Sequence, residues 1–268
     1  MHDLSRLSGT TALITGASGG IGEAFARELA RRGADLVLVA RSGDRLEELA
    51  SSLRSAHGVR ALTQKLDLSE AGAARAMHEW TVEEGLEVGF LVNNAGGGVG
   101  GAAVRADPEA VAAMVRLNGN TVVDSTLRFL PGMVSRGRGA IVNVGSASAF
   151  QPTPYLAAYG GSKAMVQSFT QAVSGELAGS GVRVLAVHPG VTLSGQRSEE
   201  VLPAMARMGG ERRPEQVVAA AFRALGSGRA SVVDGRRYAA FTTLTQRLPN
   251  RAAVALARKM TQKVLSGL

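Results

Sequence analysis

The chain of 268 residues contains no cysteine, which excludes a disulfide framework, a thiolate zinc site and a cysteine nucleophile, and we expect no metal site. It has neither an apolar run of about 20 residues nor an N-terminal basic segment followed by an apolar stretch, so we expect a cytoplasmic protein without a transmembrane span. The net charge of +8 is concentrated near the C-terminus and only 4% of residues are aromatic, which argues against a nucleic-acid-binding surface.

Apolar strand segments alternate with amphipathic helical segments along the chain. The expected strands are Thr10–Thr15, Leu36–Ala40, Val59–Lys65, Val88–Asn93, Ala140–Val144, Val182–Val187 and Ala230–Val233. The expected helices are Gly20–Arg32, Asp44–Ala56, Ser69–Glu83, Pro108–Ser135, one that contains Tyr159 and ends near Ala178, and Pro214–Leu225. This alternation predicts a doubly wound α/β fold, in which a mostly parallel, Rossmann-like sheet of seven strands has helices on both faces within a single domain.

A glycine-rich turn, Thr15-Gly-Ala-Ser-Gly-Gly-Ile-Gly22, joins the first strand to the first helix. A dinucleotide pyrophosphate needs close backbone approach and a helix N-terminus aimed at it, and glycines allow both. Such a turn could also be only a loop, but its place at a strand-to-helix junction favours dinucleotide binding. The expected cofactor contacts are Gly16, Ser18, Gly20, Ile21 and Gly22.

The end of the second strand predicts which nicotinamide cofactor binds. An NAD site usually has a carboxylate there, about 20 residues beyond the glycine turn, to bind the adenosine ribose. This chain has Ala40, Arg41 and Ser42 instead. A guanidinium suits a 2′-phosphate, so we expect Arg41 and Ser42 to favour NADP(H) over NAD(H). A solvated arginine before the next helix is the simpler alternative.

Two further strand ends carry candidate cofactor contacts. Asp67 and Leu68 follow the third strand, where the carboxylate could accept a hydrogen bond from the adenine amino group or merely cap a helix. The fourth strand ends in Asn93-Asn-Ala-Gly96, which could approach the cofactor through Asn94, Ala95 and Gly96 or tie neighbouring strands together.

The clearest catalytic signal is the sequence Tyr159-Gly-Gly-Ser-Lys163. The tyrosine and the lysine are four residues apart on a helix and therefore share a face. A free phenol titrates near about pH 10, but a fixed cation beside it favours the phenolate, so the pair suits acid–base chemistry at neutral pH. Taken without its neighbours, the pair could be an ordinary surface pair.

With its other motifs, the chain resembles the short-chain dehydrogenase/reductase family, in the subgroup with a Thr-Gly-x-x-x-Gly-x-Gly turn and a Tyr-x-x-x-Lys pair. The resemblance covers about residues 8–192. It implies that Tyr159 exchanges a proton with the substrate oxygen and that Lys163 favours the phenolate and holds the nicotinamide ribose. It also implies that Ser146 hydrogen-bonds the substrate oxygen and that Asn118 holds a water between Lys163 and solvent. The motifs in family order are Thr15 to Gly22, Asn93 to Gly96, Asn118, Ser146, Tyr159, Lys163 and Pro189-Gly190.

Several assignments keep alternatives. Ser148 could replace Ser146, and Asn118 could merely perturb or cap its helix. Pro189, Gly190 and Thr192 are expected to contact the cofactor, although Ser194 could bind the nicotinamide carboxamide in place of Thr192. Gly160 and Gly161 stand where the family usually has better helix formers, so we expect a substrate or subunit to approach closely there.

Two segments lie outside these motifs. Residues 193–213 form a long connection, which predicts a substrate lid or else a surface helix. We divide the chain into a dinucleotide-binding and catalytic part, 1–235, and a basic helical tail, 236–268. The tail could dock an acidic partner, an anionic membrane surface or an acyl-carrier substrate, or pack on the body or on another subunit. After Asp234 no acidic residue follows, and the basic residues are Arg236, Arg237, Arg247, Arg251, Arg258, Lys259 and Lys263.

We therefore expect an NADP(H)-dependent oxidoreductase that interconverts ketones and secondary alcohols, with Tyr159 as general acid and base. Family members commonly form dimers or tetramers, so a homodimer or homotetramer is expected. A 3-oxoacyl reductase acting on carrier- or CoA-bound substrates is the enzymatic alternative. A dinucleotide-sensing binding protein is the non-enzymatic alternative, although a sensor would need no proton donor.

Overall fold

One parallel sheet forms the centre of the molecule, with the strand order β3-β2-β1-β4-β5-β6-β7. The computed structural model describes residues 4–192 and 210–265, except for the side chains of Met260 and residues 263–265. The strands are β1 (Thr11–Thr15), β2 (Asp35–Ala40), β3 (Ala61–Lys65), β4 (Val88–Asn93), β5 (Gly139–Val144), β6 (Val182–His188) and β7 (Ser231–Val233). All neighbouring strands are parallel, which confirms the doubly wound α/β fold.

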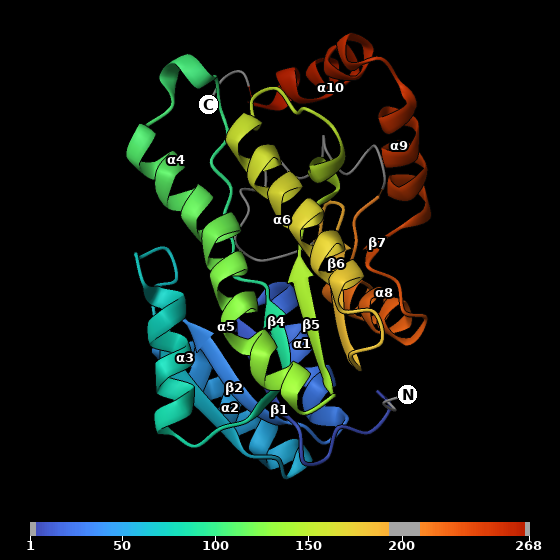
Figure 1. Cartoon of the computed structure of the whole chain (residues 1–268). Helices are drawn as coiled ribbons and strands as arrows, with labels where there is room; N and C mark the ends of the chain where they lie inside the picture. The colour runs from blue at the N-terminus through green and yellow to red at the C-terminus, as the bar shows by residue number, and fades with distance from the viewer. Residues whose placement is uncertain (1–3, 193–209, 266–268) are drawn as a thin grey trace.

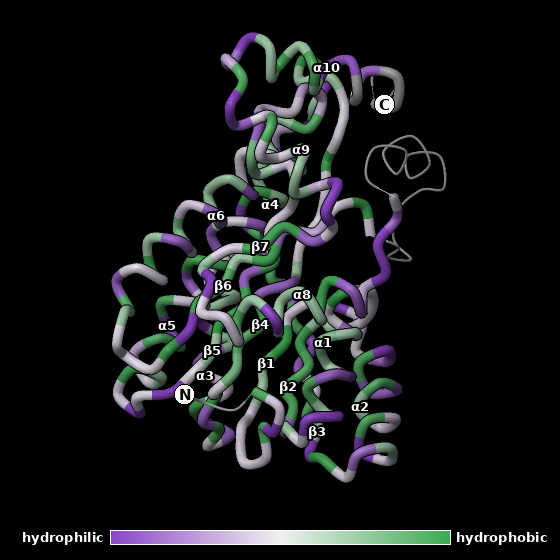
Figure 2. The backbone as a smooth tube through the Cα atoms, turned by 90° about the vertical axis from the view of Figure 1, so that its right-hand side faces the viewer, coloured by the Kyte–Doolittle hydropathy of each residue, from purple (hydrophilic) through white to green (hydrophobic). Residues whose placement is uncertain are grey.

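Helices cover both faces of this sheet (Figures 1 and 2). On one face lie α1, α2 and α8, and on the other lie α3, α5 and α6, with α4 leading into α5. The helix bounds are α1 (Gly20–Arg31), α2 (Gly43–His57), α3 (Ala73–Glu83), α4 (Pro108–Val115), α5 (Thr121–Ser135), α6 (Ala157–Glu176), α8 (Pro214–Gly226), α9 (Arg236–Arg247) and α10 (Asn250–Leu265). Within the described ranges, no helix has the length and apolarity needed to cross a bilayer.

Alternate residues of each strand supply two hydrophobic layers. In β1, Ile14 packs toward the α1 and α8 side, whereas Leu13 belongs to the cluster that includes Phe129 and Met133 of α5. Both clusters are almost fully buried. Because both faces of the sheet are covered, its strands are continuous apolar runs rather than alternating ones, which explains why the sequence predicts them well.

Two expected helices differ from the structure. The helix expected at Ser69–Glu83 begins only at Ala73, because the Asp67 carboxylate accepts hydrogen bonds from the backbone N–H and hydroxyl of Ser69 and Gly72 is left-handed (φ 80). The helix expected at Pro108–Ser135 is interrupted by a π-helical turn, Arg116–Asn120, between α4 and α5. Such turns insert one extra residue into a helix and occur frequently at functional sites.

Candidate functional site

The expected catalytic residues come from three segments near the carboxyl ends of β4 and β5. Ser146 follows β5, Tyr159 and Lys163 lie one turn apart on α6, and Asn118 lies in the π-helical turn. Ligands of open α/β sheets bind at this edge, so the fold places these residues where a site is expected.

Lys163 is a buried cation, with 4% of its surface exposed. Its Nζ donates a hydrogen bond of 2.9 Å to the carbonyl of Val144, the last residue of β5. A Cβ on Gly96 would lie 3.4 Å from this Nζ and 2.9 Å from Asn118 Oδ1. The absence of a side chain at Gly96 therefore lets α6 and the π-helical turn meet beside the end of β4.

Asn118 is fully buried and holds the loop after β4. Its Oδ1 accepts a hydrogen bond from the Gly97 backbone N–H at 3.0 Å, and its Nδ2 donates to the Gly97 carbonyl at 2.9 Å. Both contacts go to a residue in the loop after β4 and not to the backbone of its own helix, so Asn118 does not act as a helix cap. Binding of a water stays a prediction, for which the second lone pair of Oδ1 is a candidate acceptor.

Ser146 and Ser148, the two candidates for binding the substrate oxygen, are hydrogen-bonded to each other. The backbone N–H of Ser148 donates to Ser146 Oγ at 3.2 Å, and the Ser148 hydroxyl donates to the same atom at 2.8 Å. A serine oxygen that accepts in this way can still donate its own proton. Tyr159 is half-buried, and a Cβ on Gly98 would lie 3.9 Å from its ring.

The two glycines after Tyr159 differ in their surroundings. A Cβ on buried Gly160 would meet the Ser148 carbonyl at 3.4 Å, so the closest neighbour of Gly160 is this chain's own loop after β5. Gly161 is exposed, and no heavy atom lies within 4 Å of the position of its Cβ. The approach of a substrate or subunit stays a prediction for Gly161.

Replacing Gly161 with alanine tests that approach. In an open helix position the substitution should raise the free energy of unfolding by about 0.5–1 kcal/mol, because glycine loses more backbone entropy on folding than alanine. Urea unfolding of Gly161→Ala and wild type at equal protein concentration measures the difference. Destabilisation together with a changed oligomeric state would instead show that a second subunit packs against Gly161.

The glycine turn is held against the loop after β4. Thr15 Oγ1 accepts the backbone N–H groups of Asn94 and Ala95 at 2.9 and 3.0 Å. Asn94 Nδ2 donates to the carbonyls of Thr15 and Gly16 at 3.0 and 3.1 Å. A Cβ on Gly22 would lie 2.2 Å from the Gly16 carbonyl oxygen, so this packing requires glycine. Asn94 and Ala95 are thus shown to support the turn, whereas their contact with a cofactor stays a prediction.

Asn93, by contrast, ties the sheet to helix α5. Its Nδ2 donates to Asn143 Oδ1 on β5 at 2.8 Å, and its Oδ1 accepts from the Ser125 hydroxyl of α5 at 2.8 Å. Asn143 Nδ2 in turn donates to Thr170 of α6 at 3.0 Å. This buried chain of side chains connects the helices that flank the site.

The corner expected to select the cofactor holds three charged residues. The guanidinium of Arg41 lies 4.0 Å from Asp67, and both side chains are largely exposed, at 75% and 40%. The pKa of Asp67 is lowered chiefly by its hydrogen bonds from Ser69, with Arg41 contributing less. The third is Lys65, which was not expected from the sequence and whose aliphatic stem would lie 3.5 Å from a Cβ on Gly43. Ser42 and Leu68 lie at the same strand ends.

The segment after β6 is covered by α9. The Tyr238 ring lies against Gly190, because a Cβ there would come within 2.1 Å of the ring. The Tyr238 hydroxyl accepts the Val191 N–H and donates to the Gly210 carbonyl, both at 3.1 Å. Thr192 donates its hydroxyl to the Gly190 carbonyl at 3.2 Å. Tyr238 was not predicted from the sequence, because its role depends on contacts with residues that are distant along the chain.

Most of the expected lid, and Ser194 within it, lies outside the described residues. Its two flanks are joined to each other. Arg212 pairs with Thr192 in a parallel bridge and donates its backbone N–H to Val191 at 2.8 Å. Its guanidinium binds both carboxylate oxygens of buried Asp234, at 2.8 and 2.9 Å. That pairing raises the pKa of Arg212.

The loop just before α6 contains a strained residue. Tyr155 has a φ of 64, and it alone among the non-glycine residues that the structure describes has a positive φ. Such strain clusters at functional sites. The Tyr155 carbonyl accepts the Gly101 N–H at 2.9 Å, and Gln151 accepts a hydrogen bond from Thr245 of α9 at 3.3 Å.

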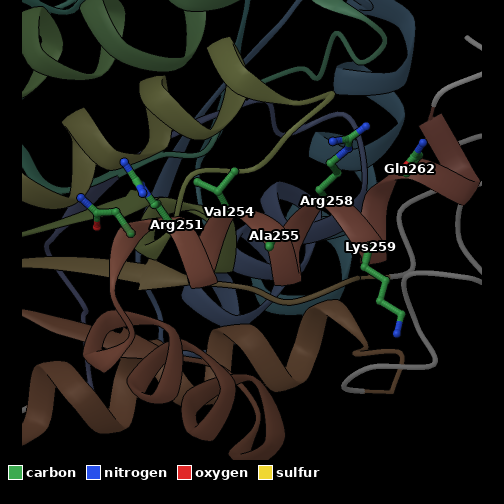
Figure 3. A pocket seen from close by; sticks show the side chains of 7 residues that line it. Arg251, Val254, Ala255, Arg258, Lys259 and Gln262 are labelled. Atoms are coloured by element: carbon green, nitrogen blue, oxygen red, sulfur yellow. The ribbon is translucent and has the colours of Figure 1, made fainter.

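The expected basic tail forms α9 and α10, at the end of the molecule toward which β5 points (Figure 1). One face of α10 buries Ala253, Ala257 and Thr261, as expected for a terminal helix that packs by its apolar side. The adjoining face of α10 borders a shallow pocket of about 550 Å³ (Figure 3). The described residues that line it are Asn250, Arg251, Val254, Ala255, Arg258, Lys259 and Gln262.

Sequence reasoning also missed His188, the last residue of β6. It is fully buried, and its ring touches the Ser146 backbone. Its only signal in the sequence is a polar residue at the end of an apolar strand, directly before Pro189-Gly190.

Known proteins resemble the chain over most of its length. A family model described as short chain dehydrogenase matches residues 10–203. A very-long-chain 3-oxoacyl-CoA reductase of Anas platyrhynchos is 34% identical over 187 residues, which cover 68% of this chain and 59% of that protein. The chain thus spans less than two thirds of the length of this curated relative.

Two solved structures share the fold. One, from work on 7β-hydroxysteroid dehydrogenase stereoselectivity, has a TM-score of 0.85 and 28% identity and covers 96% of this chain and 99% of that one. The other is a short-chain dehydrogenase from Sphingobium yanoikuyae in complex with NADPH. It has a TM-score of 0.74 and 31% identity and covers 90% of this chain and 95% of that one.

Proposed function

The chain belongs to the short-chain dehydrogenase/reductase family, and from that premise we propose that it is an NADP(H)-dependent oxidoreductase that interconverts ketones and secondary alcohols. The observation that carries this proposal is the position of Lys163. Its buried ammonium group lies one helical turn from Tyr159 and hydrogen-bonds the end of the strand that leads into Ser146. A buried cation beside a phenol and a hydroxyl is suited to proton transfer at a carbonyl oxygen.

In the proposed reduction, Ser146 and Tyr159 act on the same substrate oxygen, and Lys163 and Asn118 support them. The Ser146 hydroxyl, whose oxygen already accepts from Ser148, donates its proton toward the carbonyl oxygen as negative charge develops there. Tyr159 gives that oxygen its proton, and the Lys163 ammonium stabilises the resulting phenolate. Asn118 holds Gly97 and so fixes the loop between β4 and the site. In oxidation the same groups act in reverse.

The residues around the glycine turn fit a dinucleotide. Gly19 precedes α1 with an extended backbone, and no heavy atom lies within 4 Å of the position of its Cβ. A phosphate can therefore approach the N-terminus of α1 at this position. We propose that this turn holds the pyrophosphate and that Lys163 holds the nicotinamide ribose. When bound, the nicotinamide supplies or accepts the hydride.

The proposed preference for NADP(H) rests on the positive charge beside the end of β2. Arg41 and Lys65 place two cations beside the end of β2, where NAD sites usually have a carboxylate. The exposed Arg41–Asp67 contact at 4.0 Å is weak and leaves Arg41 able to turn to a phosphate. Several structural neighbours were solved with NADPH, among them the Sphingobium yanoikuyae protein.

Arg41→Ala should lower the ratio of kcat/KM with NADPH to that with NADH by about 10–100-fold, because a charge-assisted bond to the 2′-phosphate is lost. Initial rates with each cofactor measure this ratio. Arg45→Ala, which removes an exposed arginine from the first turn of α2, is the matched control and should leave the ratio unchanged. Equal ratios for Arg41→Ala and Arg45→Ala would contradict the assignment of Arg41.

A 3-oxoacyl thioester is the second candidate substrate. The observation that favours it is the similarity to very-long-chain 3-oxoacyl-CoA reductases, such as that of Anas platyrhynchos. The basic outer face of α10 is compatible with a phosphate-bearing carrier or an anionic surface. A dinucleotide sensor is disfavoured, because it would need neither Tyr159 nor Ser146.

A substrate panel tests the proposal. Nicotinamide absorbance is followed with NADPH and NADH against aliphatic, aryl and bulky ketones and acetoacetyl-CoA, and in reverse with secondary alcohols. Turnover of simple ketones supports a carbonyl reductase, and turnover of acetoacetyl-CoA alone supports the thioester alternative. Tight NADPH binding without turnover of any probe would favour the sensor.

A homo-oligomer is proposed from exposed apolar side chains on two neighbouring helices. Leu127 and Val134 of α5 are 51% and 39% exposed, and Met165 of α6 is 42% exposed. Large exposed apolar side chains on adjacent helices are typical of subunit interfaces. These helices form one outer layer of the molecule (Figure 1).

A further inference from the structure

His188 occupies a buried position beneath the candidate catalytic serine. Its Nδ1 lies 3.2 Å from the backbone nitrogen of Ser146 and 3.0 Å from the Ser146 carbonyl oxygen. Its Nε2 contacts Gln167 Oε1 of α6, which also accepts a hydrogen bond of 3.1 Å from the Ser231 hydroxyl of β7. The edge of the Phe150 ring completes the enclosure at 4.8 Å between ring centroids.

These partners determine which ring nitrogen carries the hydrogen. Gln167 Oε1 can only accept, so the facing Nε2 of His188 carries a proton. In the neutral ring Nδ1 then has a free lone pair and accepts the Ser146 N–H. Burial lowers the pKa of His188 to about 4; the Ser146 backbone contact opposes this shift, and the positive charge of Lys163 adds to it. The ring is therefore neutral at physiological pH. Among the described residues, Asp234 donates its backbone N–H to the His188 carbonyl, and its carboxylate is paired with Arg212.

The backbone hydrogen bonds around Ser146 explain why a side chain is needed to accept the Ser146 N–H. Gly145 donates its N–H to the Val187 carbonyl at 2.8 Å, and Ala147 donates to Pro189 at 3.0 Å. The intervening N–H of Ser146 points to the other side of this ladder, where His188 Nδ1 accepts it. A Cβ on Gly145 would lie 2.4 Å from Nδ1, so glycine leaves space for the ring.

Gln167 connects this arrangement to the catalytic helix. It follows Lys163 by one helical turn and Tyr159 by two, and therefore lies on the same side of α6. We propose that His188 is a positioning residue, which takes its tautomer from Gln167 and uses Nδ1 to fix the Ser146 backbone, and hence the Ser146 hydroxyl, relative to Tyr159 and Lys163. This inference rests on the proposed role of Ser146 in the reaction.

Two substitutions at His188 separate positioning from packing. Asparagine can place its Oδ1 near the position of Nδ1 and accept the Ser146 N–H, whereas leucine fills the space without an acceptor. With the best ketone of the panel and saturating NADPH, we expect His188→Leu to lower kcat by about 10–100-fold, as small displacements of catalytic groups do. His188→Asn should recover most of that loss, and NADPH affinity, measured by fluorescence, should stay the same in both. Equal kcat values for the two variants, both folded by circular dichroism, would overturn the proposal.

The tautomer of the His188 ring can be measured without turnover. This measurement therefore tests the role of His188 separately from the enzymatic function. In protein labelled with ¹⁵N-histidine, His188→Asn identifies the His188 signals by their loss. We expect the neutral Nε2–H tautomer at neutral pH, and Gln167→Leu should introduce the Nδ1–H tautomer. An imidazolium, or an Nδ1–H tautomer, in the wild type would overturn the proposal even if ketone turnover is normal. A chain that reduces no probe yet shows the Nε2–H tautomer would count against the enzymatic function and leave the geometry of His188 supported.

The buried histidine also predicts how the free energy of unfolding depends on pH. The unfolded chain protonates this histidine near pH 6.5, whereas the folded chain resists protonation down to about pH 4. The unfolded state therefore binds more protons in that window, and the folded state should lose stability as pH falls through it. His188→Asn should show a shallower loss between pH 6.5 and 4 than wild type. Identical slopes would contradict a buried neutral ring.

Discussion

Turnover should fall by about 10²–10⁴-fold when Tyr159 is replaced by phenylalanine, because the variant keeps the ring but has no proton to give to the carbonyl oxygen. The phenol is half-buried and stands one turn from Lys163, whose ammonium is fixed on the Val144 carbonyl at 2.9 Å. The described hydrogen bond of the Lys163 ammonium goes to a backbone carbonyl of β5, so removal of the Tyr159 hydroxyl leaves this bond in place. The loss should therefore appear in kcat, with NADPH affinity measured by fluorescence titration nearly unchanged.

Tyr155→Phe is the matched control for this experiment. Tyr155 lies four residues before Tyr159, in the loop that precedes α6, and its described hydrogen bond uses its backbone carbonyl rather than its hydroxyl. Its replacement should leave kcat within a few-fold of wild type, since the Tyr155 hydroxyl has no role in the proposed proton transfer. Normal turnover by Tyr159→Phe would reject Tyr159 as the general acid. Comparable losses of kcat in both variants would indicate that the substitutions disturb the local structure rather than remove the proton donor.

The sheet could be predicted from the sequence because its strands are buried on both faces. β2 is a run of apolar residues and was expected as Leu36–Ala40, one residue shorter than observed. The glycine turn, Ser146 and the Tyr159 helix follow such strands directly, so chain order alone places them at one edge of the sheet. Their grouping there needed no knowledge of side-chain contacts.

Other features depend on contacts that no local pattern encodes. Residues 116–120 contain a glycine and two asparagines, which are weak helix formers. This composition does not by itself predict the π-helical turn that aims Asn118 at Gly97. His188 lies 42 residues from Ser146 and 21 from Gln167, so its role appears only after folding. Tyr238 likewise reaches Val191 from 47 residues away. These residues belong to the buried layer behind the motif residues, where the partners are distant in sequence.

A Gly22→Ala substitution should abolish tight cofactor binding and also weaken the fold. Its Cβ would stand 2.2 Å from the Gly16 carbonyl oxygen and 2.6 Å from Asn94 Nδ2. The first of these atoms is backbone, so the turn itself must shift away from α1. Overpacking of this kind costs about 1–3 kcal/mol of unfolding free energy. Because the shift moves the amides proposed to face the pyrophosphate, NADPH affinity should drop by about 10-fold or more.

Gly19→Ala separates the loss of cofactor binding from the loss of stability, because Gly19 has open space around it where Gly22 is tightly packed. Gly19 has an extended backbone (φ 168), and its Cβ would meet no heavy atom within 4 Å, so urea unfolding without cofactor should match wild type. The added methyl group would stand beside the N-terminus of α1, in the space proposed for the pyrophosphate. NADPH affinity should therefore fall in Gly19→Ala without a loss of stability, whereas in Gly22→Ala both fall together. Wild-type affinity in Gly19→Ala would mean that the dinucleotide does not lie over this turn, and the proposed site would then have to be abandoned.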